Sequence, residues 1–130
     1  RSFEMANAIT TEVAKKKMLL ARAGAQLLPK ITNMAFGTGG VDAEGSVLEV
    51  GEKQQEINVE VLRKEIDEYE IISDTKIQYQ CTLEEEELVG QQLSELALVD
   101  ADGDLVAIKN FAVKEKDGDW KMVFKISDTM

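Results

Sequence analysis

Residues 93–109 read LSELALVDADGDLVAIK, and they indicate the fold class more clearly than any other part of the chain. Apolar side chains dominate residues 93–99 and 105–113, which is typical of strands. The residues between these runs, 100–104, contain an Asp-Gly step that supplies the positive φ of a tight hairpin. We therefore predict two antiparallel strands joined by a turn.

The chain that follows repeats these signals. Residues 116–119, Lys-Asp-Gly-Asp, predict a second hairpin turn, and residues 120–126 predict its outgoing strand. Alternation in that strand places four large apolar side chains on one face: Trp120, Met122, Phe124 and Ile126. We expect this face to lie in the core.

Further strands are predicted upstream. Residues 75–83 alternate cleanly between apolar and polar side chains, and residues 31–36 form a shorter candidate strand. Another strand is expected to start at Ile57, where Ile57, Val59 and Val61 alternate with polar residues. The polar, acidic residues 67–70 predict a turn. The four glutamates at 84–87 predict a solvated loop, and the glycine-rich residues 37–45 a long solvent loop.

The single cysteine, Cys81, excludes an internal disulfide. It shares the inward face of its strand with Ile77, Tyr79 and Leu83, which predicts a buried thiol. The chain contains no histidine that could activate this thiol as a nucleophile. These features indicate a protein made in a reducing compartment.

Residues 9–28 predict an amphipathic helix. Thr10 or Thr11 can cap its start, and Pro29 marks its end. Its apolar stripe consists of residues spaced by three and four: Ala14, Met18, Ala21, Ala25 and Leu28. Lys17 falls inside this stripe and is expected to snorkel. Together the elements predict an α+β domain, with the helix packed on an antiparallel β-sheet or β-sandwich of about six or seven strands.

The net charge of −10 restricts the partners of the protein. Residues 1–30 carry six basic and two acidic side chains, whereas the remaining residues carry nine basic and 23 acidic ones. A domain with this excess of negative charge repels phosphate backbones, which argues against nucleic-acid binding. The basic helix could contact an acidic partner or simply pack on the acidic sheet. No apolar run approaches the ~20 residues of a membrane span, so no membrane association is expected.

No residues form a recognisable catalytic, metal or cofactor motif. Residues 100–104 resemble the start of a calcium loop, but a glycine at position six and a glutamate at position twelve are missing. The glycine-rich residues 37–45 lack the Gly-Lys-Ser/Thr ending of a nucleotide loop. The 25 carboxylates are expected mainly in turns and on outer strand faces. We therefore expect neither an enzyme nor a cofactor.

Four segments in this order resemble the N-terminal domain of phage tail-collar fibre proteins. They are the helix opening ITTE at 9–12, LPKITNMAFGTGG at 28–40, VLRKEI at 61–66 and the hairpin 93–109. The resemblance covers nearly the whole chain from Met5. Val13 stands where many relatives have glycine. Residues 5–7, Met-Ala-Asn, are typical of a natural start, so residues 1–4 are expected to be an added remnant and 5–130 one domain.

The resemblance implies a structural role, with no catalytic residue carried over. It implies contact with the baseplate or other tail proteins, location in the virion tail after assembly in the bacterial cytoplasm, and a homotrimer in the virion. A small-ligand or carbohydrate-binding β-module is the alternative, but its sugar-stacking aromatics are scarce here.

The densest apolar cluster outside the predicted strands lies at 41–50. It comprises Val41, Val47, Leu48 and Val50, which we predict to form an interaction surface. Because three copies with a net charge of −10 would repel one another, we expect the isolated chain to be monomeric or weakly associating.

Overall fold

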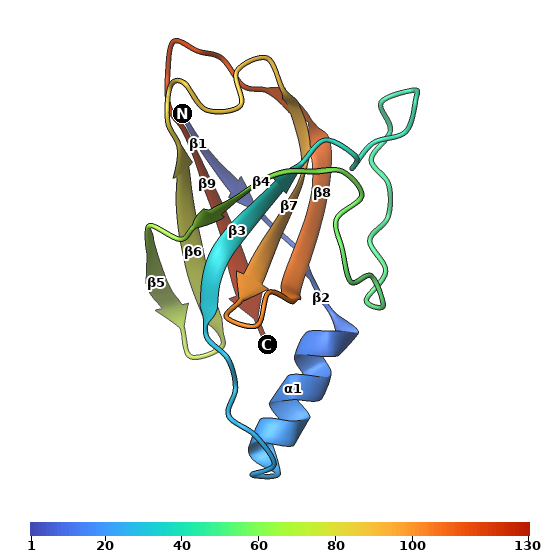
Figure 1. Ribbon diagram of the computed structural model, residues 1–130, viewed down its shortest axis with the longest axis vertical. Coiled ribbons are helices and arrows are strands. Elements are labelled where there is room, and N and C mark those ends of the chain that lie inside the picture. Colours follow the sequence, from blue (N-terminus) through green and yellow to red (C-terminus); the bar gives the residue numbers. More distant parts are fainter.

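Two β-sheets face each other in the computed structural model, which describes residues 1–130 (Figure 1). The four-stranded sheet has the order β1 (Ser2–Met5), β9 (Met122–Thr129), β6 (Lys76–Leu83) and β5 (Glu68–Ser73). The five-stranded sheet has the order β2 (Ile9–Thr10), β8 (Leu105–Glu115), β7 (Gln92–Asp100), β3 (Ile31–Gly37) and β4 (Glu60–Glu65). All neighbours are antiparallel except β1, which runs parallel to β9. The predicted α+β class is therefore confirmed, and of the two predicted arrangements, a sheet or a sandwich, the chain forms two facing sheets, with nine strands instead of six or seven.

The hairpin predicted at 93–109 is confirmed as β7 and β8. The two strands pair in antiparallel register, with Leu98 opposite Ala107. Gly103 adopts a φ of +87°, which only glycine tolerates readily. One carboxylate oxygen of Asp100 accepts hydrogen bonds from the amides of Asp102 and Asp104, at 2.9 and 3.0 Å. The turn is thus closed by its own first residue.

The prediction of a second hairpin, with its turn at 116–119, is wrong. β8 and β9 belong to different sheets, and β9 pairs with β6 and β1 instead. The backbone of Lys116 bonds to Gly90 and Gln91, so this segment follows the loop before β7 and does not fold back on β8. Trp120, which precedes β9, is 49% exposed and lies outside the core, whereas Met122, Phe124 and Ile126 are buried as predicted.

The main core fills the space between the sheets, and its buried members come from six of the nine strands. The ring of Phe124 lies at its centre, 5.4 Å from those of both Phe3 and Phe36. Phe3 belongs to β1, so residues 2–4 take part in the four-stranded sheet. The buried members are Met5, Met34, Phe36, Cys81, Leu83, Leu93, Leu96, Leu98, Ala107, Phe111, Met122, Phe124 and Ile126.

A second, smaller core covers the outer face of the five-stranded sheet. Here the long connection 38–59 returns to the sheet, and Ile57 packs on Ala35, Ala97, Val99, Leu105 and Ile108. Because this face is covered too, nearly every residue of β7 is buried. The predicted solvent loop at 37–45 is therefore only partly exposed: Gly37 and Gly40 are buried, and residues 42–45 are exposed.

The acidic turn predicted at 67–70 is wrong, because β5 spans Glu68–Ser73 and pairs with β6. All six residues of β5 are exposed, so its sequence lacks the apolar–polar contrast that marks a half-buried strand. Short edge strands of this kind, together with β1 and β2, account for the higher strand count.

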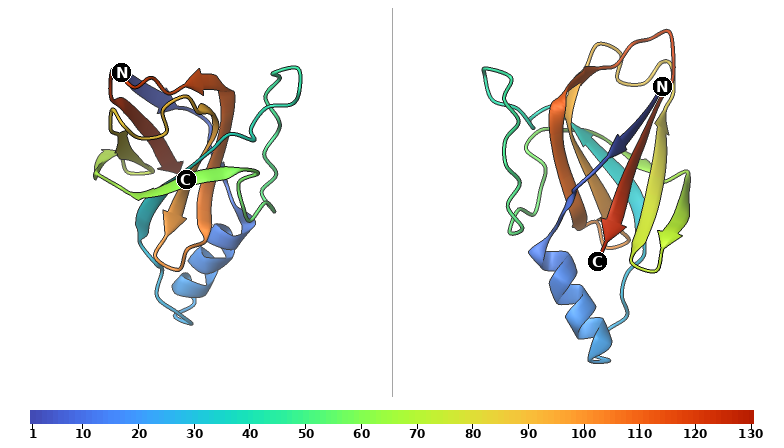
Figure 2. Two further views of the ribbon diagram at one scale, coloured as in Figure 1. Left: turned by 45° about the horizontal axis from the view of Figure 1, so that its top comes forward. Right: turned by 180° about the vertical axis from the view of Figure 1, so that it is seen from behind.

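The helix α1 spans Glu12–Arg22, and its predicted range of 9–28 is wrong. Thr11 is its N-cap and accepts a hydrogen bond from the amide of Ala14 at 3.1 Å, while Ile9 and Thr10 form β2. The helix lies at one end of the sandwich and extends beyond it, and does not cover a sheet face (Figures 1 and 2). Only Ala14 of the predicted stripe is fully buried. No helix of the protein could span a membrane.

Candidate functional site

The predicted surface at 41–50 forms a small hairpin within the connection 38–59. Val41 pairs with Val47, and the amide of Leu48 donates to the carbonyl of Gly40 at 2.9 Å. Val47 and Leu48 are 48% and 39% exposed, whereas Val41 is partly buried and Val50 packs on the second core. The structure therefore leaves two of the four predicted residues, Val47 and Leu48, as exposed apolar side chains.

A buried carboxylate, which the sequence reasoning missed, holds this connection on the sheet. Glu95 of β7 is fully buried, and one of its oxygens accepts hydrogen bonds from the amides of Gly39 and Val59 at 2.8 and 3.0 Å. Its other oxygen accepts from the amide of Asn58 at 2.5 Å. Both ends of the connection are thus bound by one side chain. The sequence signal that could have identified Glu95 was its position as the one charged residue within the mainly apolar residues 93–99.

Close backbone contact explains the glycines at the start of the connection. The amide of Gly40 donates to the hydroxyl of Ser94 at 2.8 Å, and a Cβ at Gly40 would collide with the Ser94 carbonyl. At the far side of the hairpin, the side-chain amide of Asn110 donates to the carbonyl of Leu48 at 3.0 Å. The connection is therefore fixed to β7 and β8 by hydrogen bonds to side chains of those two strands.

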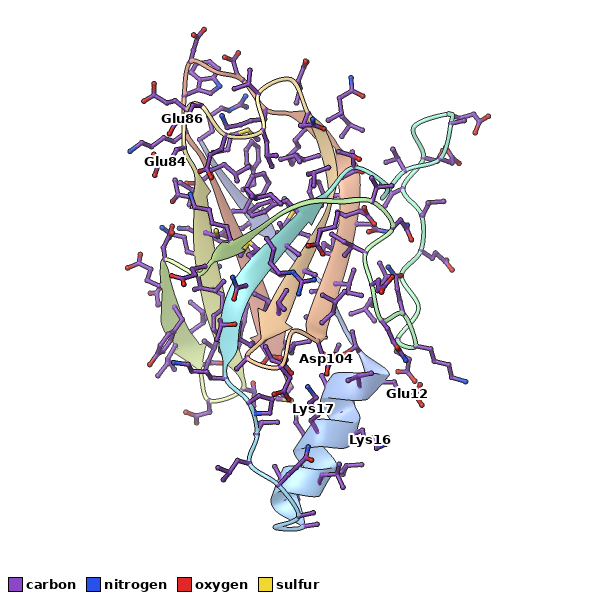
Figure 3. All side chains as sticks on the ribbon, in the orientation of Figure 1. Glu12, Lys16, Lys17, Glu84, Glu86 and Asp104 are labelled. Carbon is purple, nitrogen blue, oxygen red and sulfur yellow. The ribbon has the colours of Figure 1, made fainter.

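Three aspartates of the β7–β8 turn surround one lysine of the helix. The ammonium group of Lys17 lies 2.7, 3.1 and 2.7 Å from carboxylate oxygens of Asp100, Asp102 and Asp104. Figure 3 labels Lys17 and Asp104, which lie between the helix and the turn. The prediction that Lys17 snorkels into solvent is wrong. Its side chain is only 12% exposed. Burial lowers the pKa of Lys17, but the hydrogen bonds to Asp100, Asp104 and Asp102 outweigh burial and raise it above its ordinary value. The ammonium group occupies the position between the carboxylates that a metal ion would need.

Replacement of Lys17 by methionine is expected to lower the free energy of unfolding by about 2–4 kcal/mol, because it leaves three adjacent carboxylates without their cation. Lys16→Met is the matched control, since Lys16 is exposed and forms no ion pair; it should cost about 0.5 kcal/mol or less. Urea denaturation at low salt measures both. Equal values for the two variants would contradict the structural role of the Lys17 cluster.

The prediction that the free thiol is buried is confirmed. Cys81 is fully buried in the main core, and its sulfur lies 3.4 Å from the carbonyl oxygen of Glu65. Burial, assisted by the charge of Asp67, raises the pKa of Cys81 to about 12. A thiol of this pKa remains protonated at neutral pH and is a poor nucleophile.

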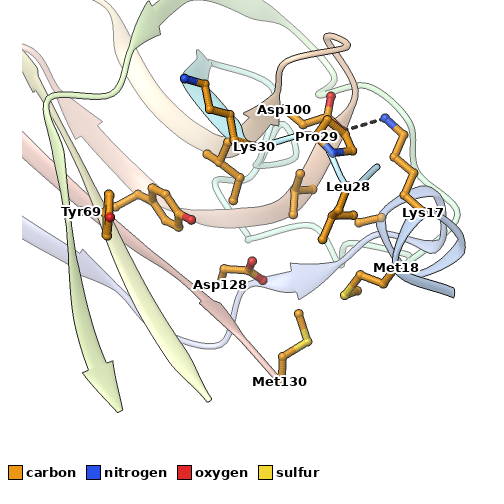
Figure 4. A pocket seen from close by; sticks show the side chains of 13 residues that line it. Lys17, Met18, Leu28, Pro29, Lys30, Tyr69, Asp100, Asp128 and Met130 are labelled. Carbon is orange, nitrogen blue, oxygen red and sulfur yellow. Dashed lines mark hydrogen bonds and ion pairs between the residues drawn. The ribbon is translucent and has the colours of Figure 1, made fainter. Parts of the chain in front are cut away.

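A pocket of about 430 Å³ opens at the end of the sandwich next to the helix (Figure 4). Its lining is mainly apolar and aromatic and comes from α1, the segment after it, both sheets and the C-terminus. The lining residues are Ala14, Lys17, Met18, Leu28, Pro29, Lys30, Ile31, Tyr69, Tyr79, Asp100, Val106, Asp128 and Met130. None of the residues predicted as an interaction surface lines it.

The pocket is one of three neighbouring hollows. Met18 and Met130 also line a second hollow, which includes Ile9, and Ile9 in turn borders a third that includes Val47 and Leu48. Each hollow thus shares lining residues with the next. The row extends from the pocket at the end of the sandwich to the exposed part of the 41–50 hairpin. We call this row of hollows the end surface. It brings Val47 and Leu48 into one surface with residues from both termini of the chain.

Comparison with known proteins gives one match. Residues 5–122 match the family model for the N-terminal part of phage tail-collar fibre proteins. No curated protein and no solved structure matches the chain.

Proposed function

Since this chain belongs to the phage tail-collar fibre protein family, as a structural component of the virion tail, we propose that it attaches the fibre at the baseplate. The family match over residues 5–122 is the observation that carries this proposal. The family is structural, which suggests that the chain is not an enzyme, and its members associate with other tail proteins. We further propose that residues 5–130 act as one domain, to whose first strand residues 2–4 add, that assembly takes place in the bacterial cytoplasm, and that the virion contains a homotrimer.

We propose the hairpin at 41–50, with Val41, Val47, Leu48 and Val50, as part of the contact to the baseplate. Val47 and Leu48 supply exposed apolar area, and the buried centre of a protein–protein contact is more apolar than the rest of the surface. The anchoring by Glu95 and Asn110 supports this proposal, because a fixed loop loses little conformational entropy on binding.

Co-sedimentation with purified tail particles that lack fibres tests the attachment. We expect the wild-type chain to sediment with the particles, and the double variant Val47→Asp/Leu48→Asp to bind about tenfold more weakly or worse, because two charges would be buried in the contact. Val113→Asp is the matched control, since Val113 is exposed to a similar degree but lies on β8 outside the end surface. Absence of wild-type binding would contradict attachment at the baseplate. Unchanged binding of the double variant would exclude the hairpin as the contact.

A further inference from the structure

Asp128 continues the buried apolar row of β9. Side chains alternate along this strand, so Asp128 faces the same way as Met122, Phe124 and Ile126, toward the other sheet. It pairs with Ile77 of β6 and lies at the end of the row, in the wall of the pocket (Figure 4). A carboxylate therefore occupies a position where the pattern of the strand calls for an apolar side chain.

The charge of Asp128 is not compensated within the protein. One of its carboxylate oxygens is buried and has no hydrogen-bond partner, and Asp128 takes part in no ion pair. Of the two lysines in the pocket, Lys17 is held by Asp100, and the ammonium group of Lys30 points away from Asp128 (Figure 4). Burial raises the pKa of Asp128. The remaining titratable groups that line the pocket are Tyr69, Tyr79 and Asp100.

Two tyrosines stand beside this carboxylate. Tyr69 of β5 pairs with Tyr79 of β6, and their ring centroids lie 6.0 Å apart. Register places Tyr69 on the inward side of its sheet, yet it is 63% exposed, so the opposite sheet does not cover it. On the other side of the pocket, Met18, Leu28 and Met130 provide flexible apolar walls. The pocket thus combines apolar walls, aromatic faces and an unpaired carboxylate.

This combination has a definite chemical complement. A long alkyl chain fits apolar walls, a planar cation stacks on tyrosine rings, and a cation removes the cost of a desolvated carboxylate. Arginine meets all three conditions better than lysine, because its guanidinium is planar, weakly hydrated and able to form two parallel hydrogen bonds with a carboxylate. The net charge of −10 also attracts basic segments over longer distances.

We propose that the pocket binds an arginine side chain of a partner tail protein, with its guanidinium on Asp128 and its alkyl chain between Met18 and Leu28. This inference rests on the proposed function, since it names the chemistry of the partner at the same end surface. The neighbouring hollows along Ile9 and Leu48 accommodate apolar residues next to that arginine.

N-Butylguanidinium, which carries the arginine side chain with its Cα as a terminal methyl group, is the probe for this site. We expect saturable NMR shifts of the Met18 and Met130 methyl groups at about millimolar probe, a range suited to so small a ligand. The pKa of Asp128, followed by its carboxyl carbon signal, should fall when the probe binds, because binding and ionisation are linked. n-Butanol at the same concentration should cause neither effect.

Asp128→Asn should weaken binding of the probe about tenfold or more, whereas Asp74→Asn, in an exposed turn, should leave it unchanged. The variant should fold normally, because asparagine has the same shape and removes a desolvated charge; a native-like NMR spectrum checks this. Equal binding of n-butanol, or equal binding by Asp128→Asn, would overturn the proposal. So would wild-type affinity of Asp128→Asn for tail particles, and that result would leave attachment at the baseplate intact.

Discussion

Replacement of Glu95 by alanine is expected to lower the free energy of unfolding by about 4 kcal/mol, the largest effect of any single polar substitution in this chain. The amides of Gly39, Asn58 and Val59 would each lose their acceptor. A buried amide without a partner costs about 1–3 kcal/mol, although water entering the gap would recover part of that loss. Guanidinium denaturation measures the difference from wild type.

Two further measurements make the Glu95 prediction specific. Glu115→Ala removes an exposed carboxylate from β8 and should cost about 0.5 kcal/mol or less. Native-state hydrogen exchange should show faster exchange at Gly39, Asn58 and Val59 in Glu95→Ala, because the connection is released from the sheet before the core unfolds. A loss below about 1 kcal/mol, or unchanged protection of these amides, would show that Glu95 does not anchor the connection.

Phe124→Ala should lower the free energy of unfolding by about 3–5 kcal/mol, because it empties the centre of the main core. The ring of Phe124 is fully buried and contacts those of Phe3, Phe36 and Phe111, which come from three different strands. The cavity is therefore walled by both sheets and cannot close by a shift of one strand alone. Urea denaturation, with the slope of unfolding checked for two-state behaviour, gives the value.

The neighbouring residue is the control for Phe124. Lys125 points to the opposite side of β9, and Lys125→Ala should cost about 0.5 kcal/mol or less. Met122→Ala, on the same face as Phe124, should cost about 2–5 kcal/mol. Similar losses for Phe124→Ala and Lys125→Ala would contradict the one-sided burial of this strand.

The parts of the fold that local patterns specify could be predicted. The Asp-Gly turn at 100–104 joins two strands that pair with each other, and the alternation in β6 and β9 identifies the buried face. The same turn signal at 116–119 was misleading, because sheet membership is decided by long-range pairing of β9 with β6. The helix prediction was too long, because periodicity continues to Leu28 although the tertiary structure covers little beyond Ala14.

The site could be predicted only in part, for a related reason. Val47 and Leu48 were identified because they are apolar residues outside any strand pattern. Glu95 and Asp128 were missed because a charged residue in an apolar row is usually taken as solvent-facing. Glu95 is buried because a second layer covers β7, and Asp128 lines a pocket at the open end of the sandwich. Neither feature can be read from the local sequence. A charge that interrupts a strand's buried face was the available signal in both cases.

The parallel pairing of β1 with β9 determines how the domain responds to pulling. Because the two strands run in the same direction, residues 1 and 130 lie toward opposite ends of the four-stranded sheet (Figure 1). Tension applied between those residues would slide β1 and β9 past each other, so that the hydrogen bonds over the whole register from Ser2–Val123 to Met5–Ile126 bear the load together. Bonds loaded together in shear resist a force that would open the same bonds one after another in an unzipping geometry. Tension along this axis therefore loads the pairing of β1 with β9 in shear.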